Sequence, residues 1–186
     1  MTKAETMKQN LAVFCGARFP KLADPELNVF KKDLTCFLQQ LAPKFNLVYG
    51  GGQVGLMGHV ADQFLESGAH VTGVIPEYLN TVEIQHLGVT ETQVVDDLHQ
   101  RKALMEKLAD VYLILPGGIG TLDELCEVLT LQTLNRHKKK IYIWNWKNVF
   151  GGFSHFINSG IELGFISADI LNQCVISENY QDLLNN

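Results

Sequence analysis

Three glycines in four positions separate an apolar run from a helical pattern that carries two acids. The run is Val111–Leu115, the glycines are Gly117, Gly118 and Gly120, and the acids are Asp123 and Glu124. A strand, a glycine turn and a helix N-terminus together favour phosphate binding. Glycine lets the backbone approach an anion, and the first helical turn offers unpaired N–H groups. Carboxylates beside a phosphate do not help to bind it, so the two acids suggest chemistry.

The same segment also has a purely structural interpretation. Thr121-Leu122-Asp123-Glu124 fits a capping box, with Thr121 as the N-cap and Glu124 reaching back from the third helical position. The three glycines favour a ligand site, because capping a helix does not require them. A helix start can serve both purposes, and the residues leave both open.

Arg101 lies at helical spacing on an apolar stripe with Leu98, Met105 and Leu108, which predicts an inward-facing guanidinium. An unpaired guanidinium is costly to bury, so Arg101 should face a cavity, a carboxylate or an anionic ligand. The alternative is extension along the helix edge into solvent. The neighbouring Lys102 stays ambiguous, since an exposed lysine on a helix is ordinary.

A second glycine loop, Gly50–Gly55, satisfies the GxGxxG pattern but follows the second predicted strand rather than the first. No acid stands convincingly at the end of the next strand, so a tight turn is favoured over a dinucleotide site. A P-loop is excluded, because no glycine in the chain is followed by lysine.

The composition argues for an ordinary globular protein with a small-molecule ligand. The 186 residues carry a net charge of −5 with only 15 Lys and Arg residues. This charge balance argues against a nucleic-acid-binding protein, which needs a strongly basic surface. No apolar stretch is long enough to span a membrane, and the polar residues 1–9, expected to be flexible, lack a secretory signal. The four cysteines are scattered, which favours reduced thiols and a cytoplasmic location. The six histidines are also scattered, so we expect no metal site.

Apolar β-type runs alternate with helical patterns along the chain. This alternation predicts a single α/β domain over residues 1–186, with a three-layer, doubly wound, Rossmann-like parallel sheet. Ile84–Thr92 is the least regular stretch and is expected to form a loop at the mouth of the site. The predicted strands are Leu11–Cys15, Asn46–Tyr49, His70–Ile75, Val111–Leu115, Lys140–Trp144 and Cys174–Ser177. The predicted helices are Glu26–Leu41, Val54–Ser67, Asp97–Lys107, Thr121–Arg136, Phe150–Gly160 and Tyr180–Leu184.

Two motifs together resemble the paired signature of the Lonely Guy (LOG) family of phosphoribohydrolases. They are Arg101-Lys102-Ala-Leu-Met105 and, one strand later, Pro116-Gly117-Gly118-Ile119-Gly120-Thr121-Leu-Asp-Glu124. Weaker similarities extend through most of the chain, at Cys15-Gly16, Gly50–Gly58 and Gly73–Pro76. The resemblance implies action on cytokinin riboside 5′-monophosphates, no metal or cofactor, and a homodimer whose site is completed across the interface.

The resemblance also implies roles for individual residues. Arg101 and Glu124 match the catalytic pair. The matching substrate-binding positions are Glu83, Lys102, Gly117, Gly118, Ile119, Gly120, Thr121, Leu122, Asp123 and Thr130. The chain departs from the family at Ala17-Arg18, where serines are usual, so a guanidinium could meet a phosphate there. Ile119 stands where plant members usually have tyrosine, which puts the substrate preference in question.

The leading hypothesis is hydrolysis of the N-glycosidic bond of a purine nucleoside 5′-monophosphate, AMP or an N6-modified AMP, to free base and ribose 5-phosphate. Glu124 would stabilise the oxocarbenium-like charge on the sugar and position water. One alternative is a non-catalytic carrier of a nucleotide or of a molybdenum-type cofactor. Two others are an NAD-dependent oxidoreductase and a pyridoxal-dependent decarboxylase with Lys102 as the aldimine lysine.

Overall fold

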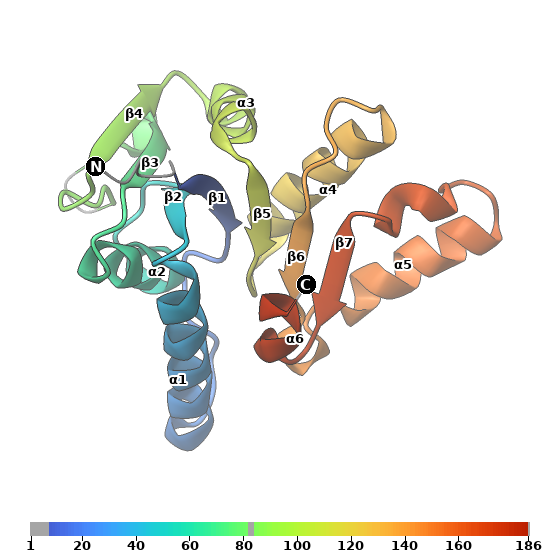
Figure 1. The fold of residues 1–186 in the computed structure, drawn as a ribbon, viewed down its shortest axis with the longest axis horizontal. Helices are drawn as coiled ribbons and strands as arrows, with labels where there is room; N and C mark the ends of the chain where they lie inside the picture. The colour runs from blue at the N-terminus through green and yellow to red at the C-terminus, as the bar shows by residue number, and fades with distance from the viewer. Residues whose placement is uncertain (1–7, 82–83, 186) are drawn as a thin grey trace, which may run out of the picture.

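The computed structural model describes residues 8–81 and 84–185, and it arranges them around one parallel seven-stranded sheet (Figure 1). The strand order is β4-β3-β2-β1-β5-β6-β7, and each neighbouring pair is parallel. The strands are β1 (Gln9–Phe14), β2 (Phe45–Tyr49), β3 (Val71–Pro76), β4 (Glu91–Val95), β5 (Val111–Ile114), β6 (Ile141–Trp144) and β7 (Cys174–Ser177).

Helices cover both faces of the sheet. They are α1 (Asp24–Leu41), α2 (Gly55–Glu66), α3 (Leu98–Leu108), α4 (Ile119–Thr133), α5 (Gly151–Glu162) and α6 (Tyr180–Leu184). Among the described residues, short 3₁₀ turns occur at Glu77–Leu79, Trp146–Asn148 and Ala168–Leu171. Figure 1 shows α1 and α2 on one side of the strands and α4 and α5 on the other.

The core is split into two apolar layers because alternate strand residues point to opposite faces. In β1, Leu11 and Val13 pack with α1, α2 and α6, whereas Ala12 and Phe14 pack with α3, α4 and α5. The predicted three-layer α/β architecture is therefore confirmed.

The sheet is doubly wound, with β1 at its centre. The chain runs outward through β2, β3 and β4, then returns to place β5 on the other side of β1. In such sheets the crevice at the carboxyl ends of the two central strands is the usual ligand site. Here the Gly16 N–H donates to the Pro116 carbonyl at 3.1 Å, which ties the loops after β1 and β5 together.

Most predicted boundaries agree with the structure within a few residues, and β7 and α6 agree residue for residue. Strand β4 was missed. Its sequence, Glu-Thr-Gln-Val-Val, has no apolar run, because an edge strand pairs on one side only and stays partly exposed. The preceding segment packs against the first glycine loop: the Gln53 N–H donates to the Ile84 carbonyl at 2.8 Å, and the His86 N–H donates to the Gly51 carbonyl at 2.9 Å.

Two expectations concern the N-terminus and membranes. Residues 1–7 of the stretch expected to be flexible lie outside the described residues, and Gln9 already belongs to β1. Within the described residues, none of the helices is both long and apolar enough to cross a bilayer.

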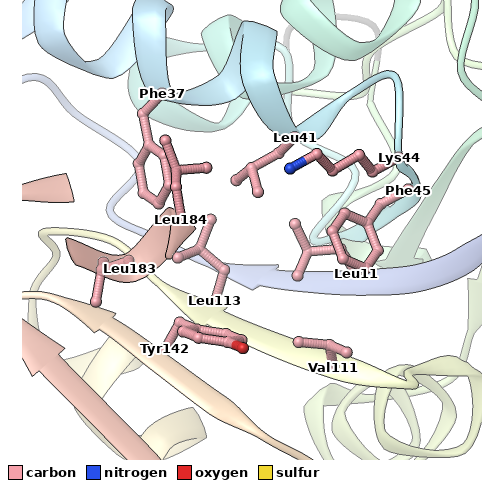
Figure 2. A pocket seen from close by; sticks show the side chains of 10 residues that line it. All are labelled: Leu11, Phe37, Leu41, Lys44, Phe45, Val111, Leu113, Tyr142, Leu183 and Leu184. Carbon is pink, nitrogen blue, oxygen red and sulfur yellow. The ribbon is translucent and has the colours of Figure 1, made fainter. Parts of the chain in front are cut away.

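An apolar cavity of about 130 Å³ lies at the amino ends of β1 and β5, beneath the end of α1 and beside α6 (Figure 2). Buried side chains such as Leu11, Phe37 and Leu113 form its walls, and the exposed Lys44 stands at its edge. The other lining residues are Leu41, Phe45, Val111, Tyr142, Leu183 and Leu184.

Candidate active site

Arg101 and Glu124 form a buried ion pair between α3 and α4. The Arg101 Nη2 donates to Glu124 Oε1 at 3.1 Å, and the two side chains are only 15% and 10% exposed. The inward-facing position predicted for Arg101 is confirmed, with a carboxylate as its partner. Of the stripe around it, Met105 is fully buried, whereas Leu98 is half exposed.

Two local features hold Arg101 in place. Asp97 caps α3, since its Oδ1 accepts the Gln100 N–H at 2.8 Å. Gly50, in the loop after β2, leaves the space that the guanidinium occupies: a Cβ at this position would lie 2.2 Å from Arg101 Nη2. The glycine loop of the GxGxxG pattern therefore leaves space for the Arg101 side chain. The tight-turn interpretation of this loop fits that geometry.

The Glu124 carboxyl group has a strongly raised pKa. Burial is the main cause, because it penalises the charged form, and the nearby Asp123 adds to it. The Arg101 guanidinium opposes this rise, and the resulting pKa is about 7. A carboxyl group that titrates near neutral pH inside a crevice is a candidate for acid–base or electrostatic catalysis.

Lys102 is held by two carboxylates of α4. Its Nζ donates to Asp123 Oδ2 at 2.9 Å and forms an ion pair with Glu127 Oε2 at 2.6 Å. Burial lowers the pKa of Lys102, but the contacts with Glu127 and Asp123 outweigh it and leave the pKa above its usual value. The ammonium therefore keeps its proton and links α3 to α4 beside the Arg101–Glu124 pair.

The capping-box prediction was wrong. Helix α4 begins at Ile119 with Gly118 as its N-cap, and no side chain caps it. Thr121 therefore lies inside the first turn, where it is 2% exposed, and a Cβ at Gly117 would lie 2.0 Å from its hydroxyl oxygen. Glu124 points to Arg101 instead of reaching back to the helix start.

The remaining residues of the glycine loop are open to a ligand or to solvent. An added Cβ at Gly118 or Gly120 would meet no atom within 4 Å, and Ile119 is 82% exposed. Because the N-cap residue Gly118 provides no side-chain cap, the first N–H groups of α4 are available to a ligand. Leu122 is partly buried against the core and therefore supports the helix.

One predicted residue, Thr130, is not brought into this group. Thr130 is exposed on α4 beyond the charged cluster, and its hydroxyl donates to the Cys126 carbonyl at 2.7 Å. Glu83 lies outside the described residues.

Sequence reasoning missed three contributors. Gly50 was considered as part of a turn or a dinucleotide loop and in the family resemblance, but its role in making room for Arg101 was not predicted. Glu127 was not singled out, yet its i,i+4 spacing from Asp123 puts both acids on one face of α4. Cys15, which was singled out only through the family resemblance, is partly buried, and desolvation together with the Glu124 charge raises the pKa of its thiol.

A hollow of about 350 Å³ opens between the loops after β1 and β5. Arg18 stands on its edge, and Gly117 and Gly118 connect it to the start of α4. The other lining residues are Gly16, Ala17, Pro20, Leu56, Pro116 and Val149. In the described part of the chain, His, Cys, Asp and Glu side chains form no cluster of three or more that could hold a metal ion.

Comparison with known proteins identifies the family. A family model described as "Possible lysine decarboxylase" matches residues 57–186. The cytokinin riboside 5′-monophosphate phosphoribohydrolase of Rhodococcoides fascians is 35% identical, over 96% of this chain and 89% of that protein. LOG1 of Arabidopsis thaliana, which carries the same enzyme name, is 35% identical over 97% of this chain and 83% of its own length. The chain belongs to the LOG family.

The solved structures similar to this LOG-family chain are more distant in sequence. A molybdenum cofactor binding protein from Rippkaea orientalis superposes with a TM-score of 0.67 at 17% identity, over 97% of this chain and 95% of that one. The molybdenum cofactor carrier protein of Chlamydomonas reinhardtii gives 0.66 at 16% identity, over 96% and 95% of the two chains. At this identity the likeness shows a shared fold.

Proposed function

We propose that this LOG-family protein hydrolyses the N-glycosidic bond of purine nucleoside 5′-monophosphates, AMP or N6-modified AMP, to free base and ribose 5-phosphate. The observation that carries the proposal is the buried Arg101–Glu124 pair next to an open glycine loop at the carboxyl ends of β1 and β5. The enzyme names of relatives at 35% identity support this substrate class.

The glycine loop is suited to the 5′-phosphate. Gly118 and Gly120 present an accessible backbone, and the uncapped start of α4 adds unpaired N–H groups and a positive dipole end. A phosphate fixed there holds the ribose in one place, which removes much of the entropic barrier to reaction. Glu124 follows on the second turn of the same helix.

Glu124 is proposed to act on the sugar as a carboxylate. Breaking the bond between C1′ and the base builds oxocarbenium-like positive charge, which a nearby carboxylate stabilises. Water then adds its oxygen to C1′, and Glu124 orients this water and takes its proton, while the base leaves with the bonding electrons and acquires a proton. Arg101 keeps part of the Glu124 population ionised near neutral pH.

The structure gives less support to the alternatives. The carrier proteins share the fold at 15–17% identity, and that likeness does not extend to their ligand. An aldimine lysine must lose its proton, whereas Lys102 is held protonated by Asp123 and Glu127. The backbone of the GxGxxG loop bonds to the segment at Ile84–His86, which favours a turn over a dinucleotide site.

We also propose that the protein is a single domain, forms a homodimer and is located in the cytoplasm. The seven strands form one continuous sheet, which supports a single domain. The large apolar side chains of Ile119 and Leu134 are exposed at the two ends of α4, which supports a homodimer that uses this helix. The four cysteines are free thiols, which supports a cytoplasmic location.

Product analysis tests the proposed function. Purified protein is incubated with AMP and with N6-isopentenyl-AMP, and the base, ribose 5-phosphate and inorganic phosphate are quantified. We expect base and ribose 5-phosphate in equal amounts without inorganic phosphate. Release of phosphate without base, or no product from either nucleotide, refutes the proposal.

A further inference from the structure

Arg18 lines the hollow between the loops after β1 and β5, and its side chain is exposed. Within the described residues, Arg101 and Lys102 are both paired with acids of α4, whereas Arg18 has no acid within ion-pair distance. No Asp or Glu is among the described residues that line the hollow. The cation of Arg18 is therefore available to an anionic ligand.

The backbone of Arg18 lies close to two other elements. At Gly55, where φ is +64°, a Cβ would lie 2.3 Å from the Ala17 carbonyl oxygen and 2.9 Å from Arg18 Cα. The backbone at the start of α2 therefore lies in close contact with the backbone of Ala17 and Arg18. On the other side, the Gly16 N–H bond to the Pro116 carbonyl fixes this loop beside the glycine loop. These contacts keep Arg18 at the hollow.

Two helix N-termini add positive potential to the same hollow. Leu56 of α2 and Gly118 at the start of α4 both line it, and neither helix has a side-chain cap. Each helix start is equivalent to roughly +0.5 of an elementary charge, so the two contribute about +1. A phosphate monoester carries about −1.5 to −2 near pH 7, so one further cation brings the site close to neutrality.

We propose that Arg18 binds the 5′-phosphate of the substrate and sets the preference of this protein for nucleoside monophosphates over nucleosides. The inference rests on the proposed function and extends it to a residue outside the Arg101–Glu124 pair. The guanidinium fork matches phosphate oxygens in a bidentate manner, and the flexible exposed side chain can close over the anion. Arg18 is a specificity residue, distinct from the groups that act on the sugar.

The test compares wild type with Arg18→Ser, Arg18→Lys and Arg136→Ala. Arg136 is an exposed arginine beyond the far end of α4 and serves as the matched control. For Arg18→Ser we expect kcat/KM for AMP to fall roughly 10- to 100-fold, the loss of one charged hydrogen-bonding group. Hydrolysis of adenosine should stay at the wild-type rate, Arg18→Lys should recover part of the loss, and Arg136→Ala should behave as wild type.

Calorimetric binding of ribose 5-phosphate, with ribose as the reference, gives a readout that needs no turnover. We expect Arg18→Ser to raise the Kd for ribose 5-phosphate by a similar factor. Equal Kd values in wild type and Arg18→Ser, or an unchanged ratio of AMP to adenosine hydrolysis, overturns the inference even where base release is intact. If wild type releases no base, the proposed function fails, and the binding comparison alone decides the role of Arg18.

Discussion

The two ends of the β-sheet have hollows that are built from different parts of the chain. At the amino ends of β1 and β5, the cavity of about 130 Å³ is walled by apolar side chains that belong to the core (Figure 2). At the carboxyl ends of the same strands, the hollow of about 350 Å³ is lined mostly by residues of the loops after β1 and β5, with Arg18 among them. The Arg101–Glu124 pair follows on the helices that leave this end.

The comparison shows that a cavity left by core packing and a site where reactive groups converge can lie at opposite ends of the same strands. The apolar cavity is a packing defect: the side chains of α1 and α6 do not fill all the space above Leu11 and Leu113. The carboxyl end collects loops and helix starts, so unpaired N–H groups and charged side chains converge there. Changes at the carboxyl end should therefore affect catalysis, and changes at the amino end should affect stability.

The largest effect is expected from Arg101→Ala. Removing the guanidinium leaves the buried Glu124 carboxyl without its partner, so its pKa rises further and its active form becomes scarce. We expect kcat/KM for AMP at pH 7 to fall roughly 100- to 1000-fold. Arg101→Lys is the matched control and should retain more activity. If the activity of Arg101→Ala stays within a few-fold of wild type, the roles assigned to Arg101 and Glu124 are wrong.

At the amino end, Leu113→Ala should reduce stability without reducing activity. Leu113 is 1% exposed and lines the apolar cavity, so its truncation enlarges a void. We expect the free energy of unfolding to fall by about 3 kcal/mol, measured by urea denaturation. The volume-conserving Leu113→Met should lose about 1 kcal/mol. A large drop in kcat/KM per folded molecule would mean that the two ends are coupled.

The pH dependence offers a third comparison, through Glu124, whose pKa is about 7 against an ordinary value of 4.5. Below pH 7, kcat/KM should rise about tenfold per pH unit as the carboxylate forms, and level off above it. Because the native state binds this proton more tightly than the unfolded state, Glu124 should lower the free energy of unfolding by about 3 kcal/mol as pH rises from 4.5 to 7.

Glu124→Gln supplies the control for both curves. The variant has no carboxyl group at this position, so the difference in stability between wild type and variant isolates the contribution of Glu124. A difference that stays constant from pH 4.5 to pH 7.5 would contradict the raised pKa.

The smallest effect is expected from Asp97→Ala. Asp97 caps α3, the helix that carries Arg101, through a 2.8 Å hydrogen bond from the Gln100 N–H. We expect a loss of about 1 kcal/mol in the free energy of unfolding, by thermal or urea denaturation. Activity should change by no more than a few-fold, because Gly50 and Glu124 still hold the guanidinium. A tenfold or greater loss of activity would show that the cap positions the arginine.

Local sequence patterns predicted the architecture well, because buried strands and amphipathic helices carry their periodicity in short windows. The boundaries of β7 and α6 agree with the structure. The edge strand β4 was missed because its residues are half exposed and its pairing with β3 is a long-range property. The start of α4 was placed two residues late, since Thr121 resembles an N-cap whereas Gly118 has that position.

The site was predicted in part. The apolar stripe was enough to predict that Arg101 faces inward. Its partner Glu124 could be proposed only from the resemblance of two motifs to the LOG family. The contact between Lys102 and Glu127 depends on how α3 packs beside α4, and no pattern within either helix encodes that distance. The role of Gly50 is likewise set by a side chain about fifty residues later in the chain.

The central claim is that the buried carboxylate of Glu124 drives base release at the carboxyl end of the sheet. The most direct measurement is single-turnover release of base from N6-isopentenyl-AMP by wild type and by Glu124→Gln, at a pH above 7 and with both proteins shown to be folded. The account predicts release by wild type and a rate at least about 100-fold lower in the variant. Equal rates in the two proteins would contradict it.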